Sequence, residues 1–413
     1  MSKIKILLGA FLVLLSFISQ SQEKFTLSGY IKDASNGETL IGATVFVRQI
    51  EGGGVTNVYG FYSVTLPAGD YTVEYRYIGF KTETKEISLE RDIRMDVELQ
   101  GDSKQLEEVV VTGEREDANV SDIEMSTAKL DVKTISKIPA FAGEVDIIKS
   151  IQLLPGVSTV GEGASGFNVR GGGVGQNLVL LDEAPVYQSS HLFGFFSVFN
   201  PDAVKDVKLY KGGIPAKYGG RLSSILDIRM KEGNKKEYEV SGGVGTVFSR
   251  LSIEGPIIED KASFIVAGRR SYADIFAKTF TDFLDDGSAL YFYDLTAKTN
   301  LDINDKNRLF LSGYFGRDVF RFDAQQGFDW GNQTATLRWN HLFNEKFFSN
   351  TTFFYSNYDY AFAFGEDERD NFKWSSQIKT YNLKPEFTVF LNTNNELTFG
   401  GEALLYRFKP AEA

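Results

Sequence analysis

The sequence predicts a mainly β protein in three parts: an N-terminal β-sandwich, an α+β domain, and antiparallel strands of an incomplete transmembrane β-barrel. The 413 residues include 35 Phe, 19 Tyr and three Trp but only nine Pro, although hydrophobic residues make up an ordinary 42%. Short runs of alternating polarity end at Gly, Asn and Asp turn signals. After residue 233, short and long connections alternate between these runs, as they do in membrane barrels.

Composition excludes several kinds of chemistry. The chain has 44 Lys and Arg against 55 Asp and Glu, a net charge of −11, with no Cys and two His. Without a thiol there is no disulfide, thiolate nucleophile, Cys-ligated zinc or lipid-modified Cys. The acidic balance argues against nucleic-acid binding, which needs clustered Lys and Arg.

No cofactor is expected either. Residues 161–166 satisfy the pattern Gly-x-Gly-x-x-Gly. The strand, turn and helix that make this pattern a nucleotide site do not surround it. We interpret these glycines as loop residues.

The N-terminus has the order of a secretory signal. Lys3 and Lys5 precede an uncharged apolar run over residues 6–18, and Ser19-Gln20-Ser21 supplies the small residues that signal peptidase recognises. The run is too short to span a membrane as a helix. We expect a signal peptide over residues 1–21; a buried N-terminal helix is the alternative.

Residues 22–100 are expected to form the β-sandwich, because their alternating runs are short and end at regular turn signals. The segment is similar to the carboxypeptidase-regulatory-like domain, a resemblance carried by Gly29-Tyr-Ile-Lys-Asp33, Leu40-Ile-Gly-Ala43, Gly60-Phe-Tyr62, Pro67-Ala-Gly69 and Gly79-Phe80.

A peptidase carrying such a domain is the enzyme alternative, and the sequence argues against it. Zinc carboxypeptidases hold their metal with a His-x-x-Glu pair and a distant His. Here Gly194 follows His191 at that spacing, and Asn344 follows His341. We therefore expect no catalytic residues and no metal site.

Residues 101–135 form a charged linker that contains one β-branched run, Glu107-Glu108-Val109-Val110-Val111-Thr112-Gly113. An extended segment of this kind can add a strand to the sheet edge of another protein. A last strand of the sandwich is the alternative. The position of the run at 107–113 resembles that of the TonB box in TonB-dependent outer-membrane receptors of the Bacteroidetes type.

Residues 136–233 resemble the plug domain of the same receptors. The spacing of apolar residues predicts a helix over residues 145–154 that ends at Pro155-Gly156, and a strand over 177–181. The resemblance is carried by Asn168-Val-Arg-Gly171, Leu181-Asp-Glu-Ala-Pro-Val186 and Tyr218-Gly-Gly220.

The resemblance implies that apical plug loops face the incoming ligand. The candidates are Arg170, Gly171, Gly172, Gly173, Tyr187, His191, Phe193, Phe195 and Phe196. Arg170 and Arg221 are also candidates for pairing with barrel carboxylates, because guanidinium groups bind carboxylates bidentately. Solvated loop charges are the alternative for these two arginines.

Residues 234–413 are expected to form barrel strands, because apolar and polar residues alternate with a period of two. Tight polar turns are predicted at 259–261, 304–307, 344–346 and 392–395, and longer connections at 271–290, 318–331 and 360–375. About nine strands can be counted from Tyr238. Because a plugged barrel needs about 22 strands, we expect a fragment of a longer product.

The resemblance implies an outer-membrane receptor, its N-terminal domain in the periplasm, that imports an external ligand through the plugged barrel. TonB, energised by ExbB and ExbD, would pair with residues 107–113, and membrane lipid would surround the barrel. A siderophore, cobalamin, a peptide or an oligosaccharide all remain open as ligands. Lys211–Tyr218 departs from the Asp-Ala-Ser-Ala pattern of glycan importers, which argues against a surface-lipoprotein partner and against a glycan substrate. A non-transporting adhesin is the alternative function.

Overall fold

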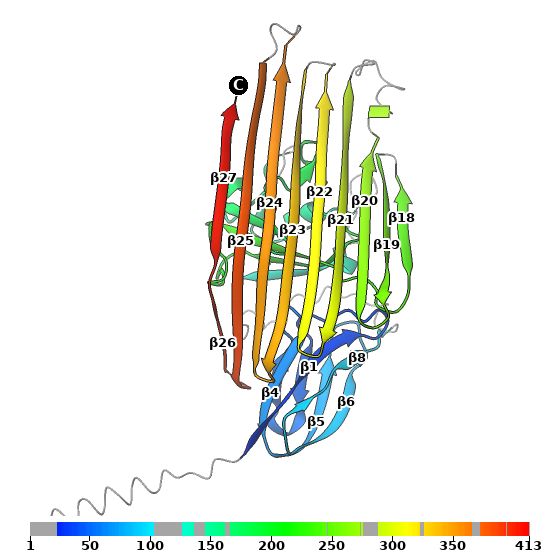
Figure 1. Cartoon of the computed structure of the whole chain (residues 1–413), viewed down its shortest axis with the longest axis vertical. Helices are drawn as coiled ribbons and strands as arrows, with labels where there is room; N and C mark the ends of the chain where they lie inside the picture. The colour runs from blue at the N-terminus through cyan, green and yellow to red at the C-terminus, as the bar shows by residue number, and fades with distance from the viewer. Residues whose placement is uncertain are drawn as a thin grey trace, which may run out of the picture.

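The computed structural model describes residues 23–102, 126–135, 145–161, 166–245, 247–272, 274–275, 288–322, 326–365, 372–393 and 395–412. It has a sandwich at one end, a tall sheet of long strands above it, and a central domain behind that sheet (Figure 1). The predicted signal peptide and the segment Glu107–Gly113 lie outside the described residues.

The sandwich (residues 23–102) has two sheets that enclose one core. In the first sheet, β1 (Lys24–Asp33) pairs antiparallel with β4 (Phe61–Pro67) and parallel with β7 (Ile93–Arg94) and β8 (Val97–Leu99). The second sheet has the order β3 (Gly52–Val55), β2 (Thr44–Val47), β5 (Gly69–Arg76) and β6 (Glu83–Leu89). Leu27, Ile31, Val45 and Val73 are buried between the sheets, which confirms the predicted sandwich.

A tight turn presents Tyr59 at the edge of this sandwich. The Asn57 side-chain oxygen accepts hydrogen bonds from the backbone N–H groups of Tyr59 at 2.9 Å and Phe61 at 3.1 Å. Gly60 has φ +78°, and a Cβ on it would lie 2.4 Å from Thr39 Cβ. Glycine is therefore required here both for its backbone conformation and for the lack of space.

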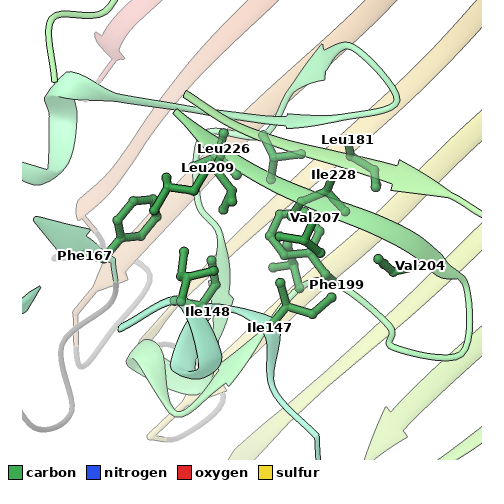
Figure 2. Close-up of a cluster of buried hydrophobic side chains, with 14 of the residues drawn as sticks. Ile147, Ile148, Phe167, Leu181, Phe199, Val204, Val207, Leu209, Leu226 and Ile228 are labelled. Atoms are coloured by element: carbon green, nitrogen blue, oxygen red, sulfur yellow. The ribbon is translucent and has the colours of Figure 1, made fainter. Parts of the chain in front are cut away.

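The central domain (residues 126–230) is built on a mixed five-stranded sheet. Its order is β13 (Ala184–Pro185), β12 (Asn177–Leu181), β17 (Ser224–Met230), β16 (Val204–Tyr210) and β9 (Thr127–Asp131). Two small hairpins, β10 (Val157–Thr159) with β11 (Phe167–Val169) and β14 (Ser190–His191) with β15 (Phe196–Ser197), complete it. Figure 2 shows the aliphatic core over this sheet, including Val207, Leu226 and Ile228.

Helix α4 (Ile147–Gln152) packs on that core and confirms the predicted helix. The Asp146 carboxylate caps it by accepting from the Lys149 N–H at 2.8 Å, and Ile147, Ile148 and Ile151 are buried. The second helix, α3 (Val132–Ile135), is a single turn. Among the described residues, no helix is long and apolar enough to cross a membrane.

The wall is one antiparallel sheet of long strands that follow one another in chain order. They are β18 (Glu239–Val244), β19 (Phe248–Ile258), β20 (Ala262–Ser271), β21 (Ala289–Asn304), β22 (Asn307–Arg321), β23 (Gly327–Asn344), β24 (Phe347–Phe364), β25 (Phe372–Asn392), β26 (Asn395–Gly400) and β27 (Ala403–Glu412). Because β26 and β27 pair with successive parts of β25, the described strands occupy nine positions, as predicted.

Side chains alternate across the wall as the sequence predicts. On β21, Asp294, Thr296 and Lys298 are buried on the inner face, against the central domain, whereas Leu295 and Leu301 are 49% and 37% exposed on the outer face. The four predicted tight turns connect β19 to β20, β21 to β22, β23 to β24 and β25 to β26. They lie at the end of the wall next to the sandwich (Figure 1).

Two of the predicted long connections are wrong. The segment 318–331 was expected to be a loop, but β22 continues to Arg321 and β23 starts at Gly327. The segment 360–375 is likewise mostly strand, because β24 ends at Phe364 and β25 starts at Phe372. The physical reason is that the aromatic residues of these segments pair across neighbouring strands, which extends the ladders.

Substitution of Gly60 tests the turn that carries Tyr59. We expect Gly60→Ala to destabilise the sandwich by more than about 2 kcal/mol, because backbone strain adds to a clash with Thr39. Gly79→Ala is the matched control, since Gly79 has φ +81° but nothing within 4 Å of the added Cβ. The measurement is the urea concentration at which trypsin cleaves half of the sandwich. Equal shifts for the two variants would show that the contact with Thr39 is unimportant.

Candidate functional site

The candidate site is the contact between the central domain and the inner face of the wall, where charged residues of the two parts meet in the interior. Asp182 and Glu183 form the tight turn between β12 and β13, both with positive φ, 46° and 76°. The Asp182 carboxylate lies 2.9 Å from Lys298 Nζ on β21, and it also accepts from the backbone N–H of Met230 at 3.0 Å. Asp182 and Lys298 are both buried, so the ion pair crosses the interior contact between the two parts.

Glu183 is shared by all three parts of the molecule. Its Oε1 lies 3.0 Å from Arg229 Nη1 in the central domain and 3.8 Å from Arg338 Nη1 on the wall. It also accepts from the Tyr59 hydroxyl of the sandwich at 3.4 Å. Burial by itself would raise the pKa of the Glu183 carboxyl, but the two guanidinium groups outweigh burial and lower the pKa to about 2.

His191 forms a second buried contact with the wall. Its Nδ1 lies 2.7 Å from Asp318 and its Nε2 3.2 Å from Asp294, and its ring stacks on Phe292 with centroids 4.2 Å apart. Arg269 pairs with the same Asp294 at 2.7 Å. Burial lowers the pKa of the His191 imidazole, but the two carboxylates more than compensate, so the pKa is raised.

The sandwich docks on the end of the wall that carries the four tight turns. Tyr59 and Phe61 stack on Phe348 at 5.5 Å each, and the Arg308 guanidinium lies 3.5 Å above the Tyr30 ring. Further contacts are polar. The Ser63 hydroxyl donates to the Glu345 carbonyl of the wall at 2.7 Å, and the Thr39 hydroxyl donates to Glu232 at 3.0 Å. Lys205 Nζ of the central domain lies 3.8 Å from Glu38 of the sandwich and also 3.8 Å from Glu232.

The predicted aromatic candidates fall into two groups. His191 and Phe196 are buried in the contact with the wall, Phe196 against Phe248 and Phe292. Phe193 and Phe195 remain 36% and 45% exposed.

Tyr187 anchors the central domain to two strands of the wall. Its hydroxyl lies 2.8 Å from Thr380 Oγ1, and its backbone N–H donates to Asn332 at 3.2 Å. Burial raises the pKa of its phenol.

Arg170, in the glycine-rich turn, and Arg221 each donate a hydrogen bond to another residue of the central domain. Arg170 Nη2 donates to Ser126 at 3.0 Å, and Arg221 Nη1 donates to the Gly220 carbonyl at 2.8 Å. A Cβ on Gly172 would lie 2.3 Å from Ser223 Oγ, whereas Gly171 and Gly173 have open space around them. Ligand contact by residues 170–173, and pairing of Arg170 and Arg221 with wall carboxylates, stay predictions.

Sequence reasoning did not single out Asp182, Glu183, Arg229 or Arg338. The available signal was two consecutive acidic residues directly after the apolar strand 177–181, where solvent would normally be excluded. Within the described ranges, no three His, Asp or Glu side chains are arranged to hold a metal ion. The buried ion pairs lock the central domain to the wall electrostatically.

Removal of the Glu183 charge tests this lock. We expect Glu183→Gln to destabilise the docked central domain by about 3 kcal/mol, because Arg338 stays buried without its carboxylate partner and Arg229 keeps only Asp227. The measurement is the urea concentration at which protease cuts the central domain in detergent. Glu83→Gln is the control, since the Glu83–Lys85 pair at 2.7 Å is about half exposed and should contribute less than about 1 kcal/mol. Similar shifts for both variants would contradict the buried lock.

The pH dependence of the same measurement tests His191. Because its pKa is raised in the folded state, its stabilisation is complete below the ordinary value of about 6.5 and is lost as the pH rises through the folded pKa. We expect the central domain to become easier to cut as the pH rises above about 6.5, and His191→Gln to abolish this dependence. His341→Gln, a change of the second of the two histidines, should leave it intact. A dependence that persists in His191→Gln would contradict this assignment.

Comparison with known families agrees with this geometry. Residues 27–111 match the CarboxypepD_reg-like domain, and residues 122–224 match the TonB-dependent Receptor Plug Domain. The sandwich and the central domain correspond to these two matches.

Sequence relatives and solved structures agree with these two family matches. The chain is 24% identical over 329 residues to TonB-dependent receptor P3 of Formosa agariphila, covering 76% of this chain and 31% of that protein. It is 26% identical over 254 residues to TonB-dependent receptor SusC of Bacteroides thetaiotaomicron, covering 59% of this chain and 24% of that protein. The chain thus spans about a third or less of these relatives.

The fold is similar to that of the siderophore receptor PirA from Acinetobacter baumannii, with a TM-score of 0.53 and 16% identity over 71% of this chain and 49% of that one. The ferric enterobactin receptor PfeA from Pseudomonas aeruginosa gives a TM-score of 0.52 and 17% identity, over 71% of this chain and 50% of that one. With a regulatory-like sandwich ahead of a plug domain and a wall of antiparallel strands, the chain is similar to the TonB-dependent receptors.

Proposed function

We propose that the chain is the plug-bearing part of an outer-membrane transporter that imports an external ligand, and that it is a transporter and not an enzyme. In this proposal the sandwich lies in the periplasm, and membrane lipid contacts the outer face of the wall. Exposed apolar residues on that outer face support the lipid contact, among them Leu311 at 52%, Leu337 at 45% and Phe353 at 46%.

One observation carries the proposal. The central domain has an aliphatic core of its own, to which the wall contributes only Tyr314 among the described residues. Its attachment to the inner face combines discrete polar contacts with two small apolar clusters. The polar contacts are Asp182 to Lys298, Glu183 to Arg338, His191 to Asp294 and Asp318, and Tyr187 to Thr380. The apolar clusters join Leu192 and Phe196 to Phe248 and Phe292, and Ala203 to Ile265 and Ala267. A domain that keeps its core when these contacts break can be displaced as a unit.

The energy source in this proposal is TonB, driven by ExbB and ExbD. The β-branched run Val109-Val110-Val111-Thr112 has no Pro and is flanked by charged residues, which suits addition to the sheet edge of a partner. A pull on this segment acts on the central domain through the chain that follows it, because β9 begins at Thr127 and pairs with β16 in the central sheet.

A non-transporting adhesin is the second candidate, favoured only by the barrel wall, which an adhesin would also need. An adhesin would not need residues 107–113 to pair with a partner protein. Crosslinking therefore separates the two functions without knowledge of the ligand.

The absence of Cys makes that experiment unambiguous. We expect single Cys substitutions at Val109, Val110 and Val111 to form disulfides in cells with Cys placed on the strand edge of TonB. Val55→Cys, an exposed position at 61% on the sandwich, should form none. The measurement is the yield of the crosslinked band with and without the proton gradient. Failure at all three positions would overturn TonB coupling and favour the adhesin.

A further inference from the structure

Three basic side chains lie next to one another on the outer face of the wall, on β25 and β27. Cross-strand register places Lys379 of β25 directly opposite Arg407 of β27. Lys409 follows two residues later on β27, opposite Gln377. We call Lys379, Arg407 and Lys409 the basic patch.

The basic patch faces away from the central domain. Thr380 of β25 points to the interior, where its hydroxyl lies 2.8 Å from the Tyr187 hydroxyl. Because side chains alternate along a strand, Lys379 points to the opposite face. Arg407 shares that face as the direct cross-strand partner of Lys379, and Lys409 has the same parity as Arg407. Arg407 and Lys409 are exposed, and Lys379 is partly exposed.

The charges of the basic patch are not neutralised within the part of the chain that the structure describes. Like charges directly opposite each other on a sheet repel. None of the three cations forms an ion pair with a described carboxylate, and Asp359, opposite Gln377, is held by Arg317 at 2.9 Å. Arg407 contacts the Tyr381 ring, 5.8 Å from its centroid, a contact that cancels no charge. The patch is therefore suited to bind an external anion.

The position of the basic patch along the wall indicates which kind of anion reaches it. The outward residues of β25 that come before it are apolar or aromatic: Tyr381, Leu383, Pro385, Phe387, Val389 and Leu391. The ten steps from Tyr381 to Leu391 rise about 25 Å, at about 3.3 Å per residue and a strand tilt of about 40°. That is about the height of the apolar band that membrane barrels present to lipid. Lys379 is the first outward residue beyond this band.

Tyrosine rings lie at the boundary between the apolar band and the basic patch. Tyr381 is opposite Tyr355 of β24, with ring centroids 5.2 Å apart. On its other side Tyr381 is opposite Leu405 of β27, which is 53% exposed. Tyr has an apolar ring and a polar hydroxyl, which suits it to the edge of a membrane. Along β25, Leu383, Tyr381 and Lys379 thus present an aliphatic, an amphipathic and a cationic surface in turn.

The two ends of the apolar band differ in charge. Toward the sandwich, Phe387 of β25 stacks on Phe399 of β26 at 5.5 Å. The outward residues of β25 beyond Phe387 are the uncharged Val389 and Leu391. The basic patch lies toward the other end of β25, away from the sandwich (Figure 1). An anion bound there lies in one leaflet of the membrane only.

We infer that the basic patch binds the phosphate group of a membrane lipid, in the leaflet away from the sandwich. This inference rests on the proposed function, which places lipid against the outer face, and adds the chemistry of the lipid headgroup. The Arg407 guanidinium can donate two parallel hydrogen bonds to phosphate oxygens, and the two Lys ammonium groups add positive charge. The acyl chains of the lipid lie along Leu383 and Leu405.

The test is native mass spectrometry of the detergent-purified protein with two lipids that differ only in the phosphate. The probes are dipalmitoyl phosphatidic acid and dipalmitoylglycerol, and we expect only the first to bind. Arg407→Gln and Lys379→Gln should each weaken the phosphatidic acid complex about ten-fold, because each removes a charge-assisted hydrogen bond. Lys379→Arg should keep most of the affinity.

Two further variants control for charge and for folding. Lys306→Gln removes the same charge from an exposed position in the tight turn between β21 and β22, and it should leave the affinity unchanged. Lys379→Glu replaces the repulsion with Arg407 by an attraction. This variant should resist urea at least as well as the unmodified protein, yet lose more affinity than Lys379→Gln.

Several outcomes would overturn the inference: equal binding of the two lipids, unchanged affinity in the Arg407 and Lys379 variants, or an equal loss in Lys306→Gln. Displacement of phosphatidic acid by an equimolar amount of inorganic phosphate would also overturn it, because the patch would then bind the free ion. None of these outcomes affects the TonB crosslink, so failure of the lipid site and failure of the import function are distinguishable.

Discussion

The structure depends on one electrostatic constraint: charges that the central domain buries against the wall must find partners there. Glu183 meets this constraint by sharing one carboxylate oxygen with Arg229, Arg338 and the Tyr59 hydroxyl. An unpaired ion in this position would cost several kcal/mol, so the three parts fit together in one register only. The same pairs are local and few.

The wall has two faces with different environments, because side chains alternate along each strand. With a period of two, each strand directs one set of side chains to the outer face and the other to the interior, and unbroken register keeps neighbouring strands in phase. Along the interior, the wall presents buried charged residues to the central domain, among them Asp294, Lys298 and Arg338. One sheet thus supplies the partners that hold the central domain.

The sandwich takes part in this arrangement directly. Its Asn57–Gly60 turn carries Tyr59 under Arg338, 5.1 Å from the guanidinium, and against Phe348. Because Tyr59 also reaches Glu183, a displacement of the sandwich and a displacement of the central domain disturb the same group of residues. The regulatory-like domain is therefore mechanically connected to the plug and is not an independent appendage.

The sequence by itself determined the sandwich, the helix at 147–152, the tight turns, the nine strand positions and the alternation of the wall, because each depends on local periodicity and turn chemistry. It misplaced the aromatic ends of β22 to β25 as loops, since their strand character comes from pairing with neighbours. Only the tertiary structure decided that Asp182, Glu183 and His191 meet Lys298, Arg338 and Asp318, more than 100 residues away. A side chain's charge is readable in sequence, but the partner that stabilises it in the interior is set by how distant strands are brought together.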